Sequence, residues 1–140
     1  MAKLQAVDAR RRESESEKIT INLGYVDLGH IDLLVQEGFY SNRTDFIRTA
    51  IRSQLGTHGE VLKQGATRRS MVLGLQRYTR QDLENVRAAG QQLHIHVLGL
   101  ATIDDDVSPQ LALQAIASIV VLGAFRASPA VKAALADRIR

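Results

Sequence analysis

The sequence contains no cysteine, no tryptophan and only two prolines. Without cysteine the chain can form neither a disulfide nor a thiolate metal site, and it has no cysteine nucleophile. Aromatic residues make up only 4% of the chain, so Leu, Ile, Val and Ala must build any core. No stretch approaches the ~18 consecutive apolar residues of a membrane span. The N-terminus has no apolar segment of signal-peptide length, and we expect a cytoplasmic protein with no membrane partner.

Sequence motifs of enzymes are also missing. There is no G-x-S-x-G segment and no glycine-rich loop of the phosphate-binding kind, so we expect neither catalysis nor a cofactor. The net charge of +3 is too small to indicate a polyanion partner by itself. With 45% hydrophobic and 24% charged residues the composition is typical of a globular protein, so the order of the residues must indicate the function.

Residues 1–17 are polar and show no periodicity. The basic run Arg10-Arg11-Arg12 is followed by alternating glutamates that end at Glu17. Charge blocks without apolar positions are typical of disordered segments. We therefore expect a flexible arm of mixed charge.

A short β-strand is predicted directly after this arm, because residues 19–23 read ITINL. Alternation places successive side chains on opposite faces of a strand. The apolar set is Ile19, Ile21 and Leu23, and the polar set is Lys18, Thr20 and Asn22. The strand therefore has one face to bury and one face to expose.

Two helices are predicted after the strand. The strand and the two helices together define a domain over residues 18–58. Residues 25–38 carry apolar residues at three- and four-residue steps and end at Gly38, a favourable C-terminal stop. Ser41 is a good N-cap for the second helix. The apolar positions of the second helix include Phe46, Ile47 and Ile51. Residues 59–70 are interpreted as a linker.

One strand and two helices cannot bury their apolar faces within about 40 residues. The simplest remedy is a homodimer in which two copies of ITINL pair antiparallel about a two-fold axis. The predicted dimer core is Ile19, Ile21, Leu23, Leu34, Phe46, Ile47 and Ile51. Lys18, Thr20 and Asn22 then lie on the outer face of a two-stranded ribbon, which fits the DNA major groove.

The segment KITINLGYVDLGHIDLLVQEGFYSNRTDFIRTAIRSQL resembles the ribbon-helix-helix regulators of the CopG and Arc kind. The resemblance rests on the alternating strand, on the glycine between the helices and on SNRTDFIRTAIR. It implies that the outward strand residues Lys18, Thr20 and Asn22 contact bases. It also implies that Ser41, Asn42 and Arg43, at the start of the second helix, bind a phosphate of double-stranded DNA.

A weak repeat occupies residues 71–140. The tripeptide VLG begins at Val72, Val97 and Val121, and each copy is expected to end a strand and lead to a helix. Ser108-Pro109 and Ser128-Pro129 are matched N-cap and N1 pairs. Three strand-turn-helix units suggest a small β/α domain for oligomerisation or effector binding. The complete chain is predicted to be of the α+β class.

His94 and His96 are weak candidates for a metal site, because two residues that are two apart in a strand face the same way. The nickel-responsive ribbon-helix-helix regulator uses a similar pair, but this sequence lacks the cysteine of that site. A polar strand face opposite Leu93, Ile95 and Val97 explains the same spacing without a metal, so we expect no metal site.

The sequence thus predicts a DNA-binding transcriptional regulator, specifically a repressor that acts as a homodimer or as a higher oligomer through residues 71–140. Three alternatives fit the same N-terminal pattern. An antitoxin would use its tail to bind a toxin, although residues 71–140 look folded rather than tail-like. A metal-responsive regulator would use the histidines. A plasmid partition or relaxosome accessory protein would bind DNA in the same way.

Overall fold

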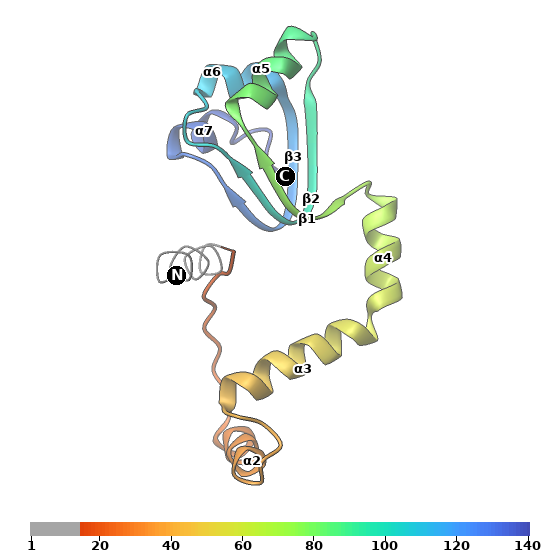
Figure 1. Ribbon diagram of the computed structural model, residues 1–140, viewed down its shortest axis with the longest axis vertical. Coiled ribbons are helices and arrows are strands. Elements are labelled where there is room, and N and C mark those ends of the chain that lie inside the picture. Colours follow the sequence, from red (N-terminus) through yellow and green to blue (C-terminus); the bar gives the residue numbers. More distant parts are fainter. Residues whose placement is uncertain (1–14) are drawn as a thin grey trace, which may run out of the picture. The chain divides into compact units, whose positions relative to one another are not determined.

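The computed structural model describes residues 15–140 (Figure 1). The arm predicted over residues 1–17 lies almost wholly outside the described residues. The chain divides into two compact units, Met1–Glu60 and Val61–Arg140, which we call the N-terminal unit and the C-terminal unit. Helices and three strands occur together, so the chain is of the mixed α+β class.

Helix α2 (Tyr25–Gln36) is the first described helix of the N-terminal unit, and it confirms the first predicted helix. Its end has a Schellman geometry around Gly38, whose φ is +85°. The amide of Phe39 donates to the carbonyl of Leu34 at 3.0 Å, and the amide of Gly38 donates to that of Val35 at 3.1 Å. The positive φ explains why a glycine stands here.

Helix α3 (Arg43–Thr57) confirms the second predicted helix but begins after a different cap. The residue at the N-cap is Asn42 and not Ser41 as predicted, because the Asn42 side chain accepts a hydrogen bond from the amide of Asp45 at 2.8 Å. Asparagine and serine are about equally good caps. Two adjacent cap residues therefore left the boundary uncertain by one position.

Helix α4 (Gly59–Arg68) occupies most of the segment interpreted as a linker, residues 59–70. Gly59 and Gly65 each cost about 1 kcal/mol relative to alanine in a helix. The intervening residues, EVLKQ, include good helix formers that offset this cost. Thr67 also donates its hydroxyl to the carbonyl of Lys63 at 2.9 Å. The connecting segment is therefore helical rather than irregular.

The C-terminal unit contains a three-stranded parallel sheet in the order β1-β2-β3. Strands and helices alternate along the chain. The elements are β1 (Val72–Tyr78), α5 (Arg80–Ala88), β2 (Leu93–Ile103), α6 (Pro109–Ala115), β3 (Ile116–Arg126) and α7 (Pro129–Ala134).

The three VLG segments lie side by side in this sheet. Val72 pairs with Val97, and Val97 pairs with Val121. The prediction that each VLG ends a strand was wrong, because every strand continues for at least three residues beyond its glycine. Apolar and β-branched residues follow the glycines and keep the chain in the sheet.

The glycines of these segments form a row across the sheet. Gly74, Gly99 and Gly123 have φ values of +117°, +140° and +122°, which side chains with a Cβ rarely adopt. A Cβ at Gly99 would overlap the carbonyl oxygen of Gly74, and one at Gly123 would overlap the carbonyl oxygen of Gly99. A Cβ at Gly74 would meet nothing within 4 Å. Glycine is therefore required sterically at two of the three positions.

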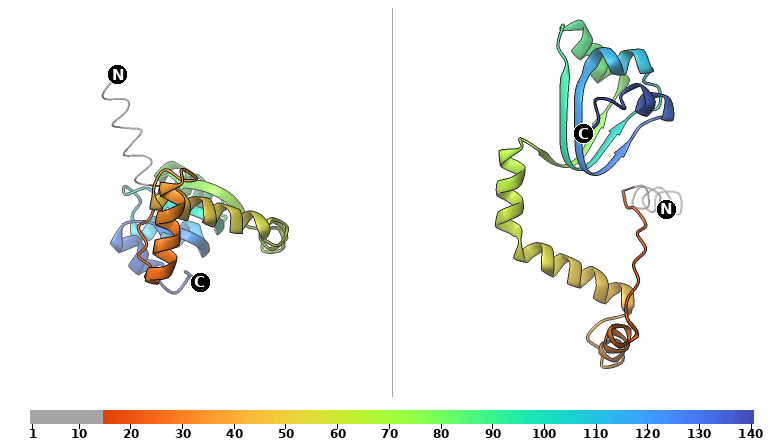
Figure 2. Two further views of the ribbon diagram at one scale, coloured as in Figure 1. Left: turned by 90° about the horizontal axis from the view of Figure 1, so that it is seen from below. Right: turned by 180° about the vertical axis from the view of Figure 1, so that it is seen from behind.

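Helices α5, α6 and α7 all lie on one side of the sheet (Figures 1 and 2). The strand order never reverses, so successive crossovers of the same hand place their helices on the same face. The core between the helices and the sheet includes fully buried Leu83, Ile95, Ile119 and Leu135. The opposite face of the sheet receives none of these helices.

Side-chain caps fix where these helices begin. Ser108 and Ser128 accept hydrogen bonds from the amides of Leu111 and Val131, which confirms the predicted Ser-Pro caps. Helices α6 and α7 are shorter than the predicted SPQLALQAIAS and SPAVKAALADR segments. Strand β3 begins at Ile116, because the β-branched residues of this segment favour a strand over a longer helix.

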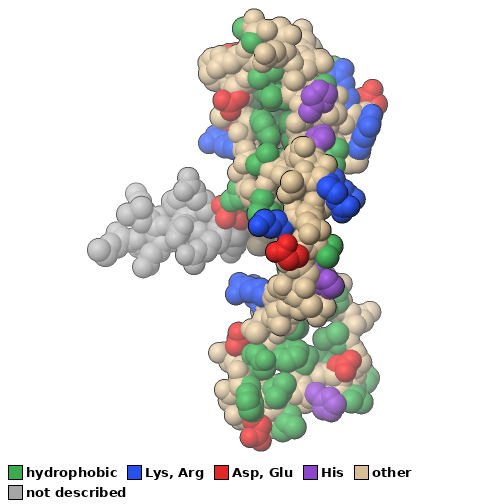
Figure 3. Space-filling view, turned by 90° about the vertical axis from the view of Figure 1, so that its right-hand side faces the viewer, with side chains coloured by type: hydrophobic (Ala, Val, Ile, Leu, Met, Phe, Trp, Pro, Cys, Tyr) green, Lys and Arg blue, Asp and Glu red, His purple; other side chains and the backbone are tan. Residues whose placement is uncertain are grey.

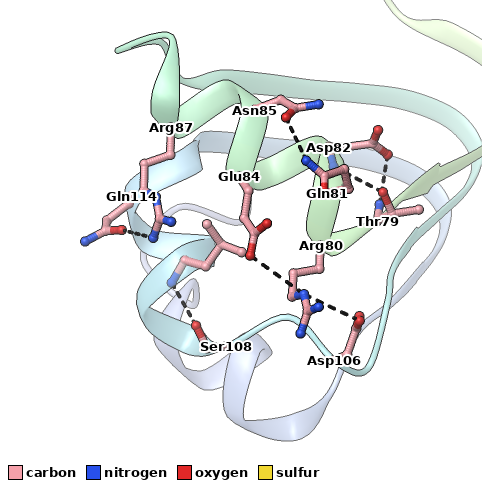
Figure 4. Close-up of polar contacts among 11 residues, drawn as sticks. Thr79, Arg80, Gln81, Asp82, Glu84, Asn85, Arg87, Asp106, Ser108 and Gln114 are labelled. Atoms are coloured by element: carbon pink, nitrogen blue, oxygen red, sulfur yellow. Dashed lines mark hydrogen bonds and ion pairs between the residues drawn. The ribbon is translucent and has the colours of Figure 1, made fainter.

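Figure 4 shows polar contacts within α5 and between α5, α6 and the loop that follows β2. Arg87 donates to the side chain of Gln114 at 3.1 Å, which joins α5 to α6. The Nε atom of Arg80 lies 3.7 Å from a carboxylate oxygen of Glu84 and 3.9 Å from a carboxylate oxygen of Asp106. Such exposed ion pairs contribute at most about 1 kcal/mol each, so apolar burial provides most of the stability of this unit.

The last residues of the chain run beside β3. The amide of Ile119 donates to the carbonyl of Arg138, and the amide of Arg140 donates to the carbonyl of Ile119, both at 2.9 Å. The Arg138 guanidinium also donates to the carbonyls of Leu113 and Ile116 at 2.6 and 2.7 Å. These bonds fasten the C-terminal segment to the junction of α6 and β3.

The glycine row predicts unequal tolerance to alanine. Gly99→Ala should lower the free energy of unfolding by about 2 kcal/mol more than Gly74→Ala, because both substitutions place a Cβ at positive φ but only one causes overlap with backbone. Urea denaturation followed by far-UV circular dichroism measures the difference. Equal losses in the two variants would show that the close approach of the strands does not limit stability.

Candidate nucleic-acid interface

The predicted strand residues form no described strand within one chain. Residues 18–24 carry no β-ladder, and every one of them is exposed. The exposed fractions of Ile19, Ile21 and Leu23 are 74%, 59% and 38%. Lys18, Thr20 and Asn22 are exposed as well. A strand needs a neighbour for its hydrogen bonds, and a single chain offers none here.

An apolar groove of about 440 Å³ opens beside this segment. The groove brings together most of the predicted dimer core. The predicted residues that line it are Ile21, Leu23, Leu34, Phe46, Ile47 and Ile51. Ile19 is not among its lining residues. Ile31 of α2 is the only buried hydrophobic residue among residues 15–60, at 6% exposed, so this unit has only half of a core.

Two polar side chains in the groove were missed by the sequence reasoning. Asp27 and His30 of α2 line it together with the apolar residues. Asp27 lies four residues and His30 one residue before Ile31, so both are within about one helical turn of it. The apolar stripe could have placed them at its border, but periodicity alone does not reveal which polar neighbours turn into a groove.

A second hollow joins the two predicted groups of DNA-binding residues. Asn22, from the outward strand set, and Arg43, from the predicted phosphate site, both line a hollow of about 630 Å³ at the start of α3. The structure therefore places Asn22 and Arg43 on a common surface. Lys18 and Thr20 do not line this hollow.

The start of α3 offers backbone amides rather than free charge. The amides of Asn42, Arg43 and Thr44 have no acceptor within residues 15–140. The amide of Ser41 already donates to the carboxylate of Asp45 at 2.9 Å. Free amides at a helix N-terminus favour an anion. Of the three predicted phosphate residues, Asn42 and Arg43 can therefore donate a backbone amide to an anion, whereas the amide of Ser41 is already used.

Arg43 holds a bidentate ion pair with Asp32 of α2. Its Nε and Nη2 donate to the two carboxylate oxygens of Asp32, both at 2.8 Å. The hydrogen bonds from Arg43 lower the pKa of Asp32 below its ordinary value. The same pair raises the pKa of Arg43. The guanidinium therefore ties α2 to α3 across their connecting loop, which the sequence reasoning did not foresee.

The histidine pair of β2 lies in the C-terminal unit. Nδ1 of His94 is 2.9 Å from Oγ of Ser118, and Nδ1 of His96 is 3.1 Å from the carbonyl oxygen of Arg69. Ile95 and Val97, which alternate with the histidines, are buried under the helices. Within residues 15–140 no group of three or more His, Asp or Glu side chains is arranged to hold a metal ion.

Comparison with protein families matches residues 14–132 to the ribbon-helix-helix transcriptional regulator family. The chain belongs to this family. Comparisons with curated proteins and with solved structures give no match. The family match reaches far beyond the N-terminal resemblance and includes the whole parallel sheet. Regulators of the ribbon-helix-helix family bind DNA as dimers and are generally not enzymes.

None of the helices in residues 15–140 of this ribbon-helix-helix protein is long and apolar enough to cross a membrane. Family membership accords with dimerisation through the exposed apolar segment at Ile19–Leu23 and the adjacent groove. Figure 3 shows hydrophobic side chains gathered on the surface of the N-terminal unit.

The ion pair between Arg43 and Asp32 predicts a specific titration shift. In Arg43→Ala the pKa of Asp32 should rise toward the ordinary value of 3.8. In the unsubstituted chain the pair stabilises the fold above the unfolded pKa of Asp32, and this contribution disappears as the pH falls through the lowered folded pKa. An NMR titration that follows the side-chain carboxyl carbon of Asp32 measures its pKa in both proteins. An unchanged Asp32 pKa in Arg43→Ala would contradict the assignment, and Arg48→Ala is the control.

Proposed function

We propose that this protein is a sequence-specific transcriptional repressor whose homodimer reads the DNA major groove with a two-stranded antiparallel ribbon. The observation that supports this proposal is the exposed apolar segment Ile19–Leu23 beside an open apolar groove. A second copy supplies both a pairing partner for the strand and the missing half of the core.

In the proposed dimer the two strands pair about the two-fold axis. Ile21 and Leu23 then enter the shared core with the groove residues of both copies. Lys18, Thr20 and Asn22 of each strand face outward. Their donors and acceptors match base edges in the major groove, where every base pair presents a distinct pattern. Sequence preference is thus assigned to the strand.

A phosphate is proposed to bind at the start of α3. Ser41, Asn42 and Arg43 open this helix, and the amides of Asn42 and Arg43 are free to donate. The Arg43 guanidinium is paired with Asp32, so its contribution comes through its backbone amide and through the position of the helix. Such a contact fixes the register of the protein on DNA but carries no base information.

The ordered C-terminal unit favours a regulator over an antitoxin. The unit has a buried core beneath three helices, whereas a tail that folds on a toxin lacks its own core. We assign to residues 71–140 the role of self-association or effector binding.

Dimerisation is tested with a matched pair of charge substitutions in the strand. Ile21→Lys should abolish the dimer, because it places two ammonium groups in the shared core. Burying these unpaired charges should destabilise the dimer by about 3–5 kcal/mol. Thr20→Lys carries the same charge on the outward face and should remain dimeric. Sedimentation velocity and circular dichroism of the full chain measure both. A dimeric Ile21→Lys variant would remove the strand from the interface.

DNA recognition is tested by separating preference from affinity. A preferred sequence is first selected from a random DNA library with the unsubstituted protein. Replacing Lys18, Thr20 and Asn22 with alanine should then remove most of the preference for this sequence over random DNA, since each base contact contributes about 1–3 kcal/mol of discrimination. The fold should remain intact, because all three side chains are exposed.

The phosphate site supplies the contrast to the strand variant. Arg43→Pro and Arg43→Ala both remove the guanidinium, but only proline removes the amide, and proline is accepted at the first helical position. Arg43→Pro should bind the selected and the random DNA more weakly than Arg43→Ala does, by similar factors. A loss of preference in Arg43→Pro with unchanged affinity for random DNA would make this position a base contact instead.

A further inference from the structure

The sheet of the C-terminal unit has an uncovered apolar face. Helices α5, α6 and α7 occupy the other face, and Figure 3 shows hydrophobic side chains gathered on the side away from them. The exposed fractions of Leu73, Leu75 and Leu122 are 75%, 55% and 45%. Neither these three leucines nor Leu98 and Leu100 of the central strand pack against the core beneath the helices. We call this surface the leucine face.

The strand register arranges the leucine face in crosswise rows. The middle row is Leu73, Leu98 and Leu122, and the next row contains Leu75, Leu100 and Ala124. On the other side of the middle row lie His96 and Val120. The end rows are polar, with Arg77, Thr102 and Arg126 at one end and His94 and Ser118 at the other.

Water contact with so many leucines is unfavourable, and parallel sheets are almost always covered on both faces. Contiguous exposed apolar patches on soluble proteins mark interaction surfaces. The crossovers all place their helices on the opposite side of the sheet. The chain therefore leaves the leucine face to be covered by something other than these helices.

We propose that the leucine face packs against the leucine face of a second copy of this chain, about a two-fold axis that runs along the middle row. This axis stacks Leu73, Leu98 and Leu122 on their own copies. It places the arginine row of one copy opposite the row of His94 and Ser118 of the other. A two-fold axis along the strands would instead stack Arg77 of one copy on Arg126 of the other. Arg77 already donates to the carboxylate of Asp104 at 2.7 and 2.8 Å, so its charge is partly balanced, but two guanidinium groups would still face each other in that arrangement.

The size of the face argues for a tethered second copy. Three strands about 4.8 Å apart and five rows about 6.7 Å apart give a flat area of roughly 400 Å². Stable interfaces bury about 800 Å² on each partner, so the leucine face is small for an independent dimer. The proposed N-terminal dimer, on which this step rests, supplies a second copy at high effective concentration.

The absence of cysteine from the sequence allows a direct test. Leu98→Cys places one thiol per chain on the proposed axis, and Thr102→Cys places one on the same face and strand but away from the axis. Gln91→Cys, in the exposed turn after α5, is the control outside the face. A short bismaleimide should join two full-length Leu98→Cys chains at least tenfold faster than it joins chains of either other variant.

The same experiment identifies other arrangements. Equal cross-linking rates in all three variants would overturn the proposal. A Leu98 thiol that is protected from monofunctional maleimide but joins no second chain would also overturn it, because another part of the same chain would then cover the face. Faster cross-linking of Thr102→Cys than of Leu98→Cys would overturn the axis. Circular dichroism of each variant verifies the fold, and Leu122→Cys replaces Leu98→Cys if the latter unfolds.

Adding Ile21→Lys separates this proposal from the N-terminal dimer. If both proposals hold, Ile21→Lys slows Leu98→Cys cross-linking at low protein concentration and high concentration restores it. If the N-terminal dimer fails but the leucine face pairs, Ile21→Lys leaves the cross-linking unchanged. If the N-terminal dimer forms but the leucine faces do not pair, Leu98→Cys gives no cross-link with or without Ile21→Lys. Ile21→Lys then still changes the oligomeric state of the protein.

Discussion

The burial of apolar surface that one chain cannot complete is the constraint on which the rest of this structure depends. In the N-terminal unit the described residues bury a single hydrophobic side chain, Ile31. The groove between α2 and α3 stays open because the elements that could close it are too few. A unit of this size gains too little from its own contacts to offset the conformational entropy lost on folding. Membership in a family of dimeric regulators accords with this deficit.

The C-terminal unit meets the same constraint in a different way. Its core beneath the helices is complete, with Leu83, Ile119 and Leu135 fully buried. Yet the unidirectional strand order leaves the other side of the sheet without helices. Each unit thus exposes a contiguous set of apolar side chains that its own chain does not cover. In both cases the simplest complement is an identical copy.

Much of the N-terminal unit could be predicted from the sequence because its signals are local. Glycine at position 38 and the apolar steps of α2 and α3 fix where those helices lie. The cap of α3 was misplaced by one residue, since Ser41 and Asn42 are chemically similar caps. The ion pair between Asp32 and Arg43 could not be predicted, because it depends on the angle at which two helices meet.

In the C-terminal unit the spacing of the VLG segments indicated strands, but it could not show how they pair. The predicted ends at Gly74, Gly99 and Gly123 were wrong because glycine is a turn residue in most local contexts. Here the glycines instead allow three backbones to approach closely within one sheet. Such a requirement exists only once neighbouring strands are in place, so no local pattern reveals it. The helix assigned to residues 59–68 was missed for the opposite reason, since two glycines hid good helix formers.

The C-terminal segment has a consequence for how this protein can assemble. An open-ended filament would form if the β1 edge of one copy added to the β3 edge of the next, because such head-to-tail contacts never close. At Ile119 the β3 edge is already paired with the backbone of Arg138 and Arg140. While residues 138–140 lie there, an added strand cannot pair with the backbone of Ile119. Head-to-tail addition along β3 would therefore require these residues to move away first.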